Sequence, residues 1–339
     1  MSNSTTVEQL NFLYDAMKHL PESQVDVLRQ VLGITEKDEE RLKGLESQTE
    51  FEIMALLLGQ VKSLTGTDES TAAMSNTPNT DFLITTLSGR KLAIEVKSSK
   101  ETKIKISSKL INEKMEFAQS VSHELYFAIK LKGHWLLLSG QYIAEQNGKI
   151  TIEKDYLASE FEDLLGERSF LFTPTLEMLS IYSKTKPSIS GIVHPEHGNL
   201  IRWSLKFNNK RLFNITVTHQ ESLAVSFVLE NLQNVMSAQY QEIINLDKDR
   251  VLIKERLTQN TFLKLSAFII APITHTINEK FNKGYTLAQF KEHLKKDKSY
   301  QKGMTRKLVM ATLALLDEKG YPVVMFLGNK GYRISDLKV

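Results

Sequence analysis

Two carboxylates and a lysine, which a predicted β-hairpin brings together, are the residues of this chain best suited to chemistry. Asp81 precedes an apolar run, Ser88-Gly89 supplies turn residues, and residues 91–97 read Lys-Leu-Ala-Ile-Glu-Val-Lys. Because alternate side chains of a strand share one face, Glu95 and Lys97 point the same way. Asp81 opens the neighbouring strand, so the hairpin can place it beside Glu95.

Two carboxylates that meet at one point can hold a hard divalent cation such as Mg2+ or Mn2+, and a neighbouring ammonium can orient or activate a water. These parts suit metal-assisted hydrolysis of a phosphodiester. Taken singly, each has a simpler explanation. A Glu-x-Lys pair on a strand is usually a solvated ion pair, and an Asp after Pro-Asn-Thr is often a turn residue. The ordered combination favours the catalytic interpretation.

The order of these residues resembles that of the PD-(D/E)xK nuclease superfamily, most closely its archaeal Holliday-junction-resolvase-like and restriction-endonuclease-like members. The family pattern is a helix with a Glu, an Asp on a strand, Glu-x-Lys on the next strand, then a helix and further strands. The segments that match it in order are 49–59, 81–84, 94–99, 108–121, 124–129 and 135–138. The resemblance spans residues 45–140 and implies an α/β fold with a restriction-endonuclease-like mixed sheet flanked by helices.

The resemblance also implies a role for each residue of the pattern. Asp81 and Glu95 bind the metal, helped by the backbone carbonyl of Val96. Lys97 positions the attacking water or stabilises charge on the phosphate. The sequence departs from a strict Pro-Asp, because Pro78 stands three residues before Asp81.

The helix-borne carboxylate of the family has two candidates here. Glu50 and Glu52 are two positions apart, so they cannot face the same way on a helix. Glu52 is preferred, because a Phe-Glu pair directly before the apolar run 53–58 matches the usual sequence pattern of the family. The family also carries a polar residue on the later helix. Gln119 is the candidate, although a Gln on a helix face is more often simply solvated.

Composition bounds the class of protein. The chain has 339 residues, of which 41% are hydrophobic and 24% charged, as in ordinary globular proteins. It has no cysteine, which excludes disulfides and thiolate metal sites and fits a reducing cytoplasm. The N-terminus lacks a signal-peptide pattern, and no stretch is long and apolar enough to span a bilayer. A cytoplasmic protein without a membrane partner is therefore expected.

Four segments are predicted along the chain. They are a helical cap at 1–44, a nuclease-like domain at 45–167, an α+β middle region at 168–279 and a winged helix-turn-helix at 280–339. In the middle region a strand meander is expected over 200–217, followed by helices around 224–244 and 249–258. The role of the middle region is unknown, and it is a candidate surface for a protein partner.

Two features of the middle region have simple explanations. His194 and His197 flank a Pro-Glu turn, but a zinc site needs three or four clustered ligands, so exposed loop residues are the better interpretation. Trp203 and Phe207 lie at strand spacing, which favours core packing over a base-stacking platform.

The C-terminal segment carries the basic charge. Residues 280–339 contain thirteen Lys or Arg and five Asp or Glu, a balance of +8 in a chain of net charge +3, so the remainder carries −5. Helix, turn, helix and hairpin resemble a winged helix-turn-helix. The residues expected to contact DNA are Lys302, Arg306, Lys307, Lys330 and Arg333. Winged helices also dock proteins, which is the alternative.

The sequence therefore predicts a metal-dependent DNA endonuclease, in restriction, phage defence, mobile-element processing or recombination. The alternative is a catalytically silent DNA-binding regulator or scaffold with a nuclease-like fold, although the intact Asp, Glu and Lys argue against it. An RNA nuclease or a transposase-like end-cutting subunit is a third possibility. A homodimer is expected, because cutting both strands generally requires two centres.

Overall fold

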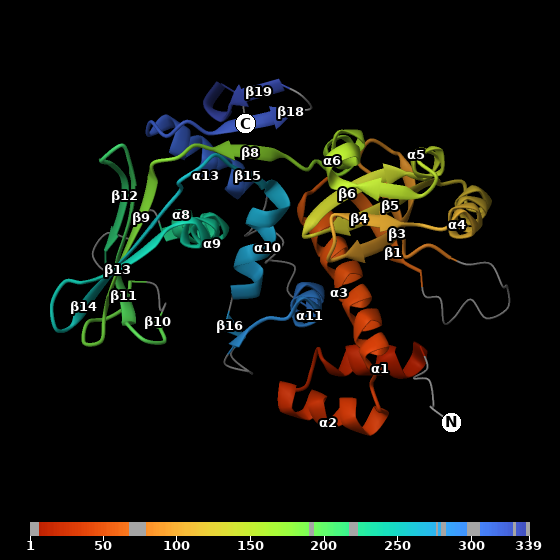
Figure 1. The fold of residues 1–339 in the computed structure, drawn as a ribbon, viewed down its shortest axis with the longest axis horizontal. Helices are drawn as coiled ribbons and strands as arrows, with labels where there is room; N and C mark the ends of the chain where they lie inside the picture. The colour runs from red at the N-terminus through yellow and green to blue at the C-terminus, as the bar shows by residue number, and fades with distance from the viewer. Residues whose placement is uncertain are drawn as a thin grey trace. The chain divides into compact units, whose positions relative to one another are not determined.

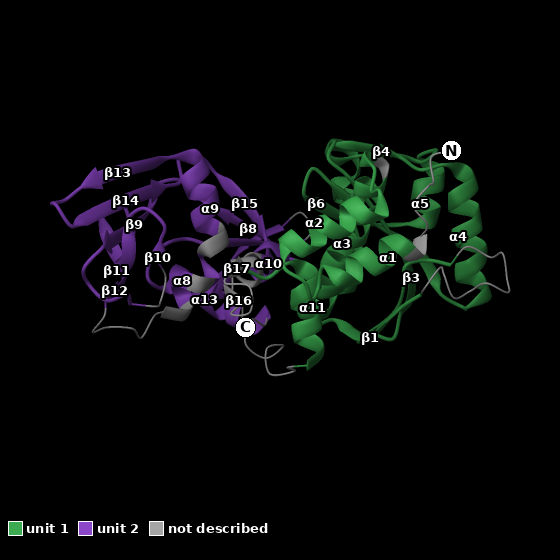
Figure 2. Cartoon of the chain, turned by 90° about the horizontal axis from the view of Figure 1, so that it is seen from below, with its two compact units in different colours: residues 1–167, 273–302 green, residues 168–272, 303–339 purple. Residues whose placement is uncertain are grey.

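The chain divides into two compact units (Figure 2). The first holds residues 1–167 and 273–302, and the second holds residues 168–272 and 303–339. The computed structural model describes residues 7–67, 79–189, 193–216, 223–275, 277–278, 283–296, 306–327 and 330–336. Pro78 and Lys302 lie outside these ranges.

Three helices open the first unit: α1 (Val7–Ala16), α2 (Glu22–Leu32) and α3 (Glu36–Leu57). Gly33 ends α2 in the left-handed conformation, at φ 63°, and Thr35 caps α3 through a capping box with Asp38. The predicted boundary at 44/45 falls inside α3. The expected cap and the nuclease-like core therefore share one continuous helix.

A five-stranded mixed sheet follows, in the order β1-β2-β3-β5-β6. Its strands are β1 (Val61–Gly66), β2 (Phe82–Thr86), β3 (Lys91–Ser99), β5 (Glu124–Leu131) and β6 (His134–Ser139). Only the β3–β5 pair is parallel. A parallel pair needs a crossover, which α4 (Ser108–Ser120) supplies. This arrangement agrees with the predicted restriction-endonuclease-like fold.

Helices cover both faces of this sheet (Figure 1). On one face, Phe51 of α3 packs against Phe82 and Trp135, with ring centroids 5.8 and 5.7 Å apart. On the other, Ile111 of α4 joins a cluster with Ala93 and strand residues of β5 and β6. Because both faces are covered, Leu92–Val96 are all buried, as the central strand of such a sheet requires.

Short elements complete the first unit. Strands β4 (Lys103–Lys105) and β7 (Lys149–Thr151) form a two-stranded ribbon. The remaining elements are α5 (Gly140–Glu145), α6 (Ile152–Asp155), the 3-10 turn η1 (Tyr156–Ala158), α7 (Phe161–Leu165), β16 (Ile277–Asn278), β17 (Lys283–Gly284) and α11 (Leu287–Lys296). Helix α10 (Leu265–His275) crosses from the second unit into the first.

The second unit contains two sheets. The larger joins β10 (Val193–His194), β11 (Gly198–Phe207), β9 (Leu176–Ser183), β14 (Arg250–Arg256) and β13 (Gln241–Asn245), with β12 (Lys210–Thr216) beside β11. The smaller has the order β15 (Thr261–Lys264), β8 (Ser169–Phe172), β18 (Val324–Leu327) and β19 (Lys330–Arg333). The remaining elements are α8 (Leu223–Val228), α9 (Glu230–Gln239), α13 (Arg306–Glu318) and the 3-10 turn η2 (Ile334–Asp336).

The prediction of a helix at 249–258 is wrong, because residues 250–256 form strand β14. Its Val251-Leu252-Ile253 run favours a strand, and pairing with β9 and β13 on either side fixes it there. The helix expected over 224–244 is shorter, since residues from Gln241 onward form β13. The predicted meander is confirmed as β11 and β12, and Trp203 is buried in the core.

The segment 280–339 is not one module. Helix α11 belongs to the first unit, whereas α13 and the β18–β19 hairpin belong to the second. Strand β18 also pairs with β8, so the hairpin is part of a four-stranded sheet and not a free wing. The physical reason lies in α11, whose Ala288 joins the apolar cluster of α1, α2 and α3.

In the ranges the structure describes, no helix combines the length and apolar character needed to cross a membrane.

Candidate active site

The β2–β3 hairpin sets Asp81 across from Glu95. Phe82 pairs with Ile94 and Leu83 with Ala93 in the antiparallel register, so the residue before Phe82 stands opposite Glu95. Directly opposed residues of an antiparallel pair share one face of the sheet. Both carboxylates therefore lie on the face that α4 covers.

The Asp81 carboxylate is held by two donors. Gln48 Nε2 on α3 donates to Oδ1 at 2.7 Å, and the Val96 backbone N–H donates to Oδ2 at 2.6 Å. Burial, and next the charge of Glu95, raise the pKa of Asp81 to about 7. The carboxyl group is therefore positioned beside β3, yet its ionised form is disfavoured by its surroundings.

Two lysines contact the opposite carboxylate. Glu95 is only 2% exposed, and Lys97 Nζ donates to its Oε1 at 2.7 Å. Lys114 Nζ, from α4, lies 3.0 Å from Oε2. That contact is an ion pair without hydrogen-bond geometry, so over the described residues Oε2 accepts no hydrogen bond.

Lys114 is the site residue that sequence reasoning missed. It is only 2% exposed, and its ammonium also donates to the backbone carbonyl of Asn79, two residues before Asp81. It therefore ties α4 to both carboxylate-bearing segments. A sequence signal exists: Lys114 follows Ile111 by three positions and precedes Ala118 by four, so it lies on the buried stripe of its helix.

Neither candidate carboxylate of α3 is seen at this centre. Glu52 Oε2 pairs with Lys291 of α11 at 2.5 Å. Glu50 accepts from Lys130 Nζ at 2.5 Å and from Trp135 Nε1 at 3.0 Å. The α3 side chain that does contact the centre is Gln48, one helical turn before Glu52. The structure thus brings together Asp81, Glu95, Val96 and Lys97 among the predicted residues, and pairs Glu52 elsewhere.

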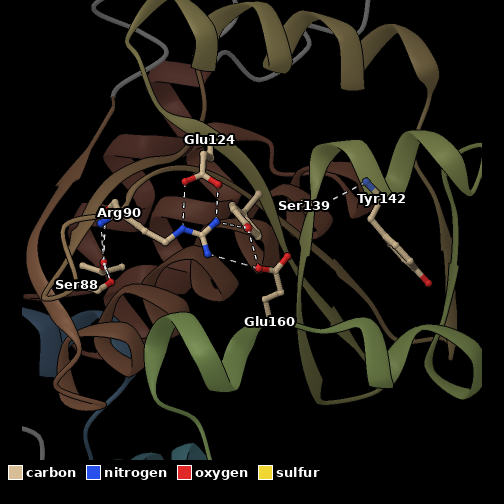
Figure 3. A network of polar contacts seen from close by, with 8 residues as sticks. Ser88, Arg90, Glu124, Ser139, Tyr142 and Glu160 are labelled. Carbon is tan, nitrogen blue, oxygen red and sulfur yellow. Dashed lines mark hydrogen bonds and ion pairs between the residues drawn. The ribbon is translucent and has the colours of Figure 1, made fainter. Parts of the chain in front are cut away.

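Gln119 is exposed on α4, in agreement with the simpler interpretation of a solvated helix residue. It lines a cavity of about 370 Å³ near the start of β5, with His123, Glu124, Tyr126, Ser139, Glu160 and four further residues. Arg90 fixes this end of the sheet: its guanidinium donates to Glu124 and to the Tyr126 hydroxyl, which in turn donates to Glu160 (Figure 3). These groups satisfy one another, which is typical of a structural network.

Four of the five predicted DNA contacts of the C-terminal segment lie in the second unit, and the fifth, Lys302, lies outside the described residues. Lys307 and Lys330 are exposed, and Arg306 is half-buried at the start of α13. Arg333 is engaged, because its guanidinium donates to the buried carboxylate of Asp317 at 2.5 and 3.1 Å. Its role in the fold is therefore to neutralise Asp317.

The centre has the donors that a hard divalent cation prefers. A bound cation would lower the repulsion between the two opposed carboxylates. It would also give a ligand to the Glu95 oxygen that accepts no hydrogen bond, and it would favour the ionised form of Asp81, whose pKa is raised. Nowhere in the described ranges do three His, Cys, Asp or Glu side chains gather as a metal-binding group. The remaining ligands would therefore be backbone oxygens and water.

His194 and His197, outside this centre, stack on each other with ring centroids 4.5 Å apart, which is a structural ring contact.

One family model matches the segment that contains this centre. The model of the archaeal Holliday junction resolvase (Hjc) family matches residues 65–170. Among solved structures, Hjc from Archaeoglobus fulgidus, a Holliday junction resolvase from an archaeal hyperthermophile, is 26% identical. That match covers 34% of this chain and 95% of that chain, with a TM-score of 0.29. No curated protein matches.

The family match contains Asp81, Glu95, Val96, Lys97 and Lys114 and begins after α3. The resemblance to PD-(D/E)xK nucleases, drawn above from a few residues, is thus confirmed for this segment. The match ends before β9, so it does not bear on most of the second unit.

Proposed function

We propose that this chain, whose residues 65–170 carry a nuclease core of the archaeal Holliday junction resolvase type, is a metal-dependent DNA endonuclease. The observation that carries the proposal is a pair of carboxylates, half-buried Asp81 and buried Glu95, opposed on adjacent strands with Lys97 beside them. Lys97 and Lys114 offset the charge of Glu95, but the ionised form of Asp81 beside it remains unfavourable, and a bound cation would lower this cost.

Asp81, Glu95 and the Val96 carbonyl are the proposed ligands of Mg2+ or Mn2+. The bound ion supplies Lewis-acid stabilisation of the charge that develops on the phosphate and on the leaving oxygen. Lys97 keeps its ammonium at the edge of the site, where it can donate to the attacking water or to a phosphate oxygen. Gln48 and the Val96 N–H hold the Asp81 carboxylate in a fixed orientation.

The family match makes a four-way junction the first substrate to test. Restriction, phage defence, mobile-element processing and recombination are the processes that such an enzyme would serve. We propose a homodimer, since two strands must be cut, and sedimentation should then give twice the mass of the 38.6-kDa chain. Lys307 and Lys330 remain proposed DNA contacts of the second unit. We also propose a cytoplasmic location, which fits the reaction. The middle region, residues 168–279, is the proposed surface for a protein partner.

The test is cleavage of labelled four-way, flap, nicked, linear and single-stranded DNA with Mg2+, with Mn2+ or with EDTA. We expect cleavage that EDTA and Asp81→Ala both abolish. Glu116→Gln, which changes an exposed carboxylate of α4 in the same segment, is the matched control and should cut like the wild type.

Binding without cleavage across the whole DNA panel would favour the silent scaffold. If no DNA of the panel is cut but a labelled RNA is, the protein is a ribonuclease and the proposed substrate is wrong. Cleavage that persists in Asp81→Ala would refute the proposed centre.

A further inference from the structure

The ribbon of β4 and β7 separates its side chains sharply by face. Ile150 is fully buried, and Ile104 packs with it against the cluster that contains Ala93. The residues that alternate with them, Lys103, Lys105 and Lys149, are exposed. One face of the ribbon thus anchors it to the core, while the other presents lysines to solvent. We call Lys103, Lys105 and Lys149 the ribbon lysines.

Lys105 and Lys149 stand directly opposite each other. The backbone bonds on either side, from Ile106 N to Gly148 O and from Ile152 N to Thr102 O, place this pair at a position without hydrogen bonds. Opposed side chains approach most closely at such positions. Like charges there destabilise an antiparallel pair, so the arrangement works against the stability of the ribbon.

Within the described ranges, this lysine pair has no acidic partner. Over the described part of the chain, no carboxylate lies within ion-pair distance of the ribbon lysines, although Glu101 and Glu153 are exposed in the adjoining segments. Elsewhere in the same unit, basic side chains do find acids: Lys97 meets Glu95, and Lys130 meets Glu50. The opposed ammonium groups are therefore arranged for an anion from outside the chain.

The ribbon adjoins the candidate active site. Strand β4 begins four residues after β3 ends, and β3 carries Glu95 and Lys97. The apolar face of the ribbon shares its cluster with Ala93, which lies two residues before Glu95 and on the same face of the sheet. The ribbon and the strand that carries Glu95 are therefore anchored in the same apolar cluster and lie close together along the chain.

We infer that the ribbon lysines bind the phosphate backbone of the DNA that flanks the cleaved bond. This inference rests on the proposed function, and it locates the DNA surface on the first unit beside the catalytic residues. A lysine contact with a phosphate adds affinity without base specificity and releases counterions, so its signature is a dependence on salt.

The test compares two double variants in an Asp81→Asn background with EDTA, where DNA stays intact. Lys105→Gln with Lys149→Gln removes the opposed pair. Lys62→Gln with Lys91→Gln removes two exposed lysines from the other end of the sheet, because Val61 and Lys91 pair with β2 far from Asp81. Fluorescence anisotropy then follows the binding of a four-way junction and of a linear duplex between about 50 and 200 mM salt.

We expect the ribbon variant to reduce the slope of log K against log salt by about 2, and the control variant to leave it unchanged. Both DNA probes should weaken alike, since phosphates carry no sequence. Lys149→Glu distinguishes a loss of DNA binding from a loss of folding, because it places opposite charges across the ribbon and should not destabilise it. This variant should melt at the wild-type temperature or above it and still bind DNA more weakly.

Equal salt slopes for the ribbon and control variants, with a wild type that binds DNA, would overturn the inference alone. The same holds if Lys149→Glu is stable and binds DNA like the wild type. A wild type without salt-dependent DNA binding would overturn the proposed function as well, so the two failures are distinguishable.

Discussion

Asp81 links the chemistry of the site to the stability of the protein. Burial and the Glu95 charge raise its pKa from 3.8 to about 7. The unfolded chain releases this proton near pH 4, whereas the folded protein retains it up to about pH 7. The folded state thus binds more protons in between, so the metal-free protein is predicted to lose stability as pH rises across that interval.

Asp81→Asn should remove this loss. At about pH 8 in EDTA, the variant is predicted to exceed the wild type in free energy of unfolding by an amount on the order of a few kcal/mol, and the two should converge as pH falls toward 4. Urea denaturation at several pH values measures both trends. Asp15→Asn, at an exposed carboxylate of α1, is the control and should stay near the wild type. A variant no more stable than the wild type at the higher pH would contradict a buried, repelled carboxylate.

Lys114 should contribute strongly to stability because it is buried against Glu95. Lys114→Met leaves Glu95 Oε2 and the Asn79 carbonyl without this ammonium, and we predict a loss of about 3 kcal/mol in urea denaturation. Lys109→Met is the matched control on the same helix. Its side chain is 84% exposed, so the expected change is under about 0.5 kcal/mol. Equal effects of the two substitutions would rule out a structural role for the buried ion pair.

At the scale of elements, one glycine attaches the β4–β7 ribbon. Gly148 has φ 72°, and a Cβ there would lie 1.9 Å from the carbonyl oxygen of Ile106. Gly133, in the β5–β6 turn, has φ 87° but no atom within 4 Å of its Cβ position.

Gly148→Ala is therefore predicted to destabilise the protein by about 3 kcal/mol or more, and Gly133→Ala by about 1 kcal/mol from backbone strain alone. The difference between the two unfolding free energies isolates the close approach, and faster hydrogen exchange at the Ile106 amide should accompany the Gly148 substitution. A Gly148 variant as stable as the Gly133 variant would show that β4 and β7 do not approach as described.

The elements near the site were predictable because their signals are local. Alternation through β3, turn residues at Ser88-Gly89 and the order of Asp81, Glu95 and Lys97 are all contained in one short stretch. Lys114 and Gln48 were missed because their partners lie on other elements, and neither residue type signals a catalytic centre by itself. Glu52 was preferred on its sequence neighbours, whereas its ion pair with Lys291 depends on a helix more than 200 residues away.

Strand β14 was also mispredicted because its structure depends on a partner that is distant in the sequence. Its residues 250–256 form the strand through pairing with β9, which lies about 70 residues earlier in the chain. Helix α11 was placed in a C-terminal module because helix, turn and hairpin follow one another in sequence. Its apolar face instead packs against α1 and α3, and the local sequence of α11 does not indicate these partners.

At the scale of the whole molecule, the chain divides into two compact units, and we predict that they respond separately. In the second unit, buried Asp317 accepts from the Val323 and Ser335 backbone amides and from Arg333. Asp317→Ala leaves these donors unpaired and is predicted to lower the melting transition of the second unit by several degrees.

Mn2+ should raise only the transition of the first unit, because the proposed ligands lie there. Scanning calorimetry of the wild type and of Asp317→Ala, each with and without Mn2+, assigns the two transitions. A single transition shifted equally by the ion and by the substitution would mean that the units unfold together.

The claim on which the account depends is that Asp81 and Glu95 share one divalent cation. An anomalous difference map from a crystal containing Mn2+ tests this directly. We predict a peak about 2.0–2.6 Å from one oxygen of each carboxylate, with the Val96 carbonyl as a further ligand. A map with no peak between these carboxylates, and with Lys97 and Lys114 still contacting Glu95, would contradict the account.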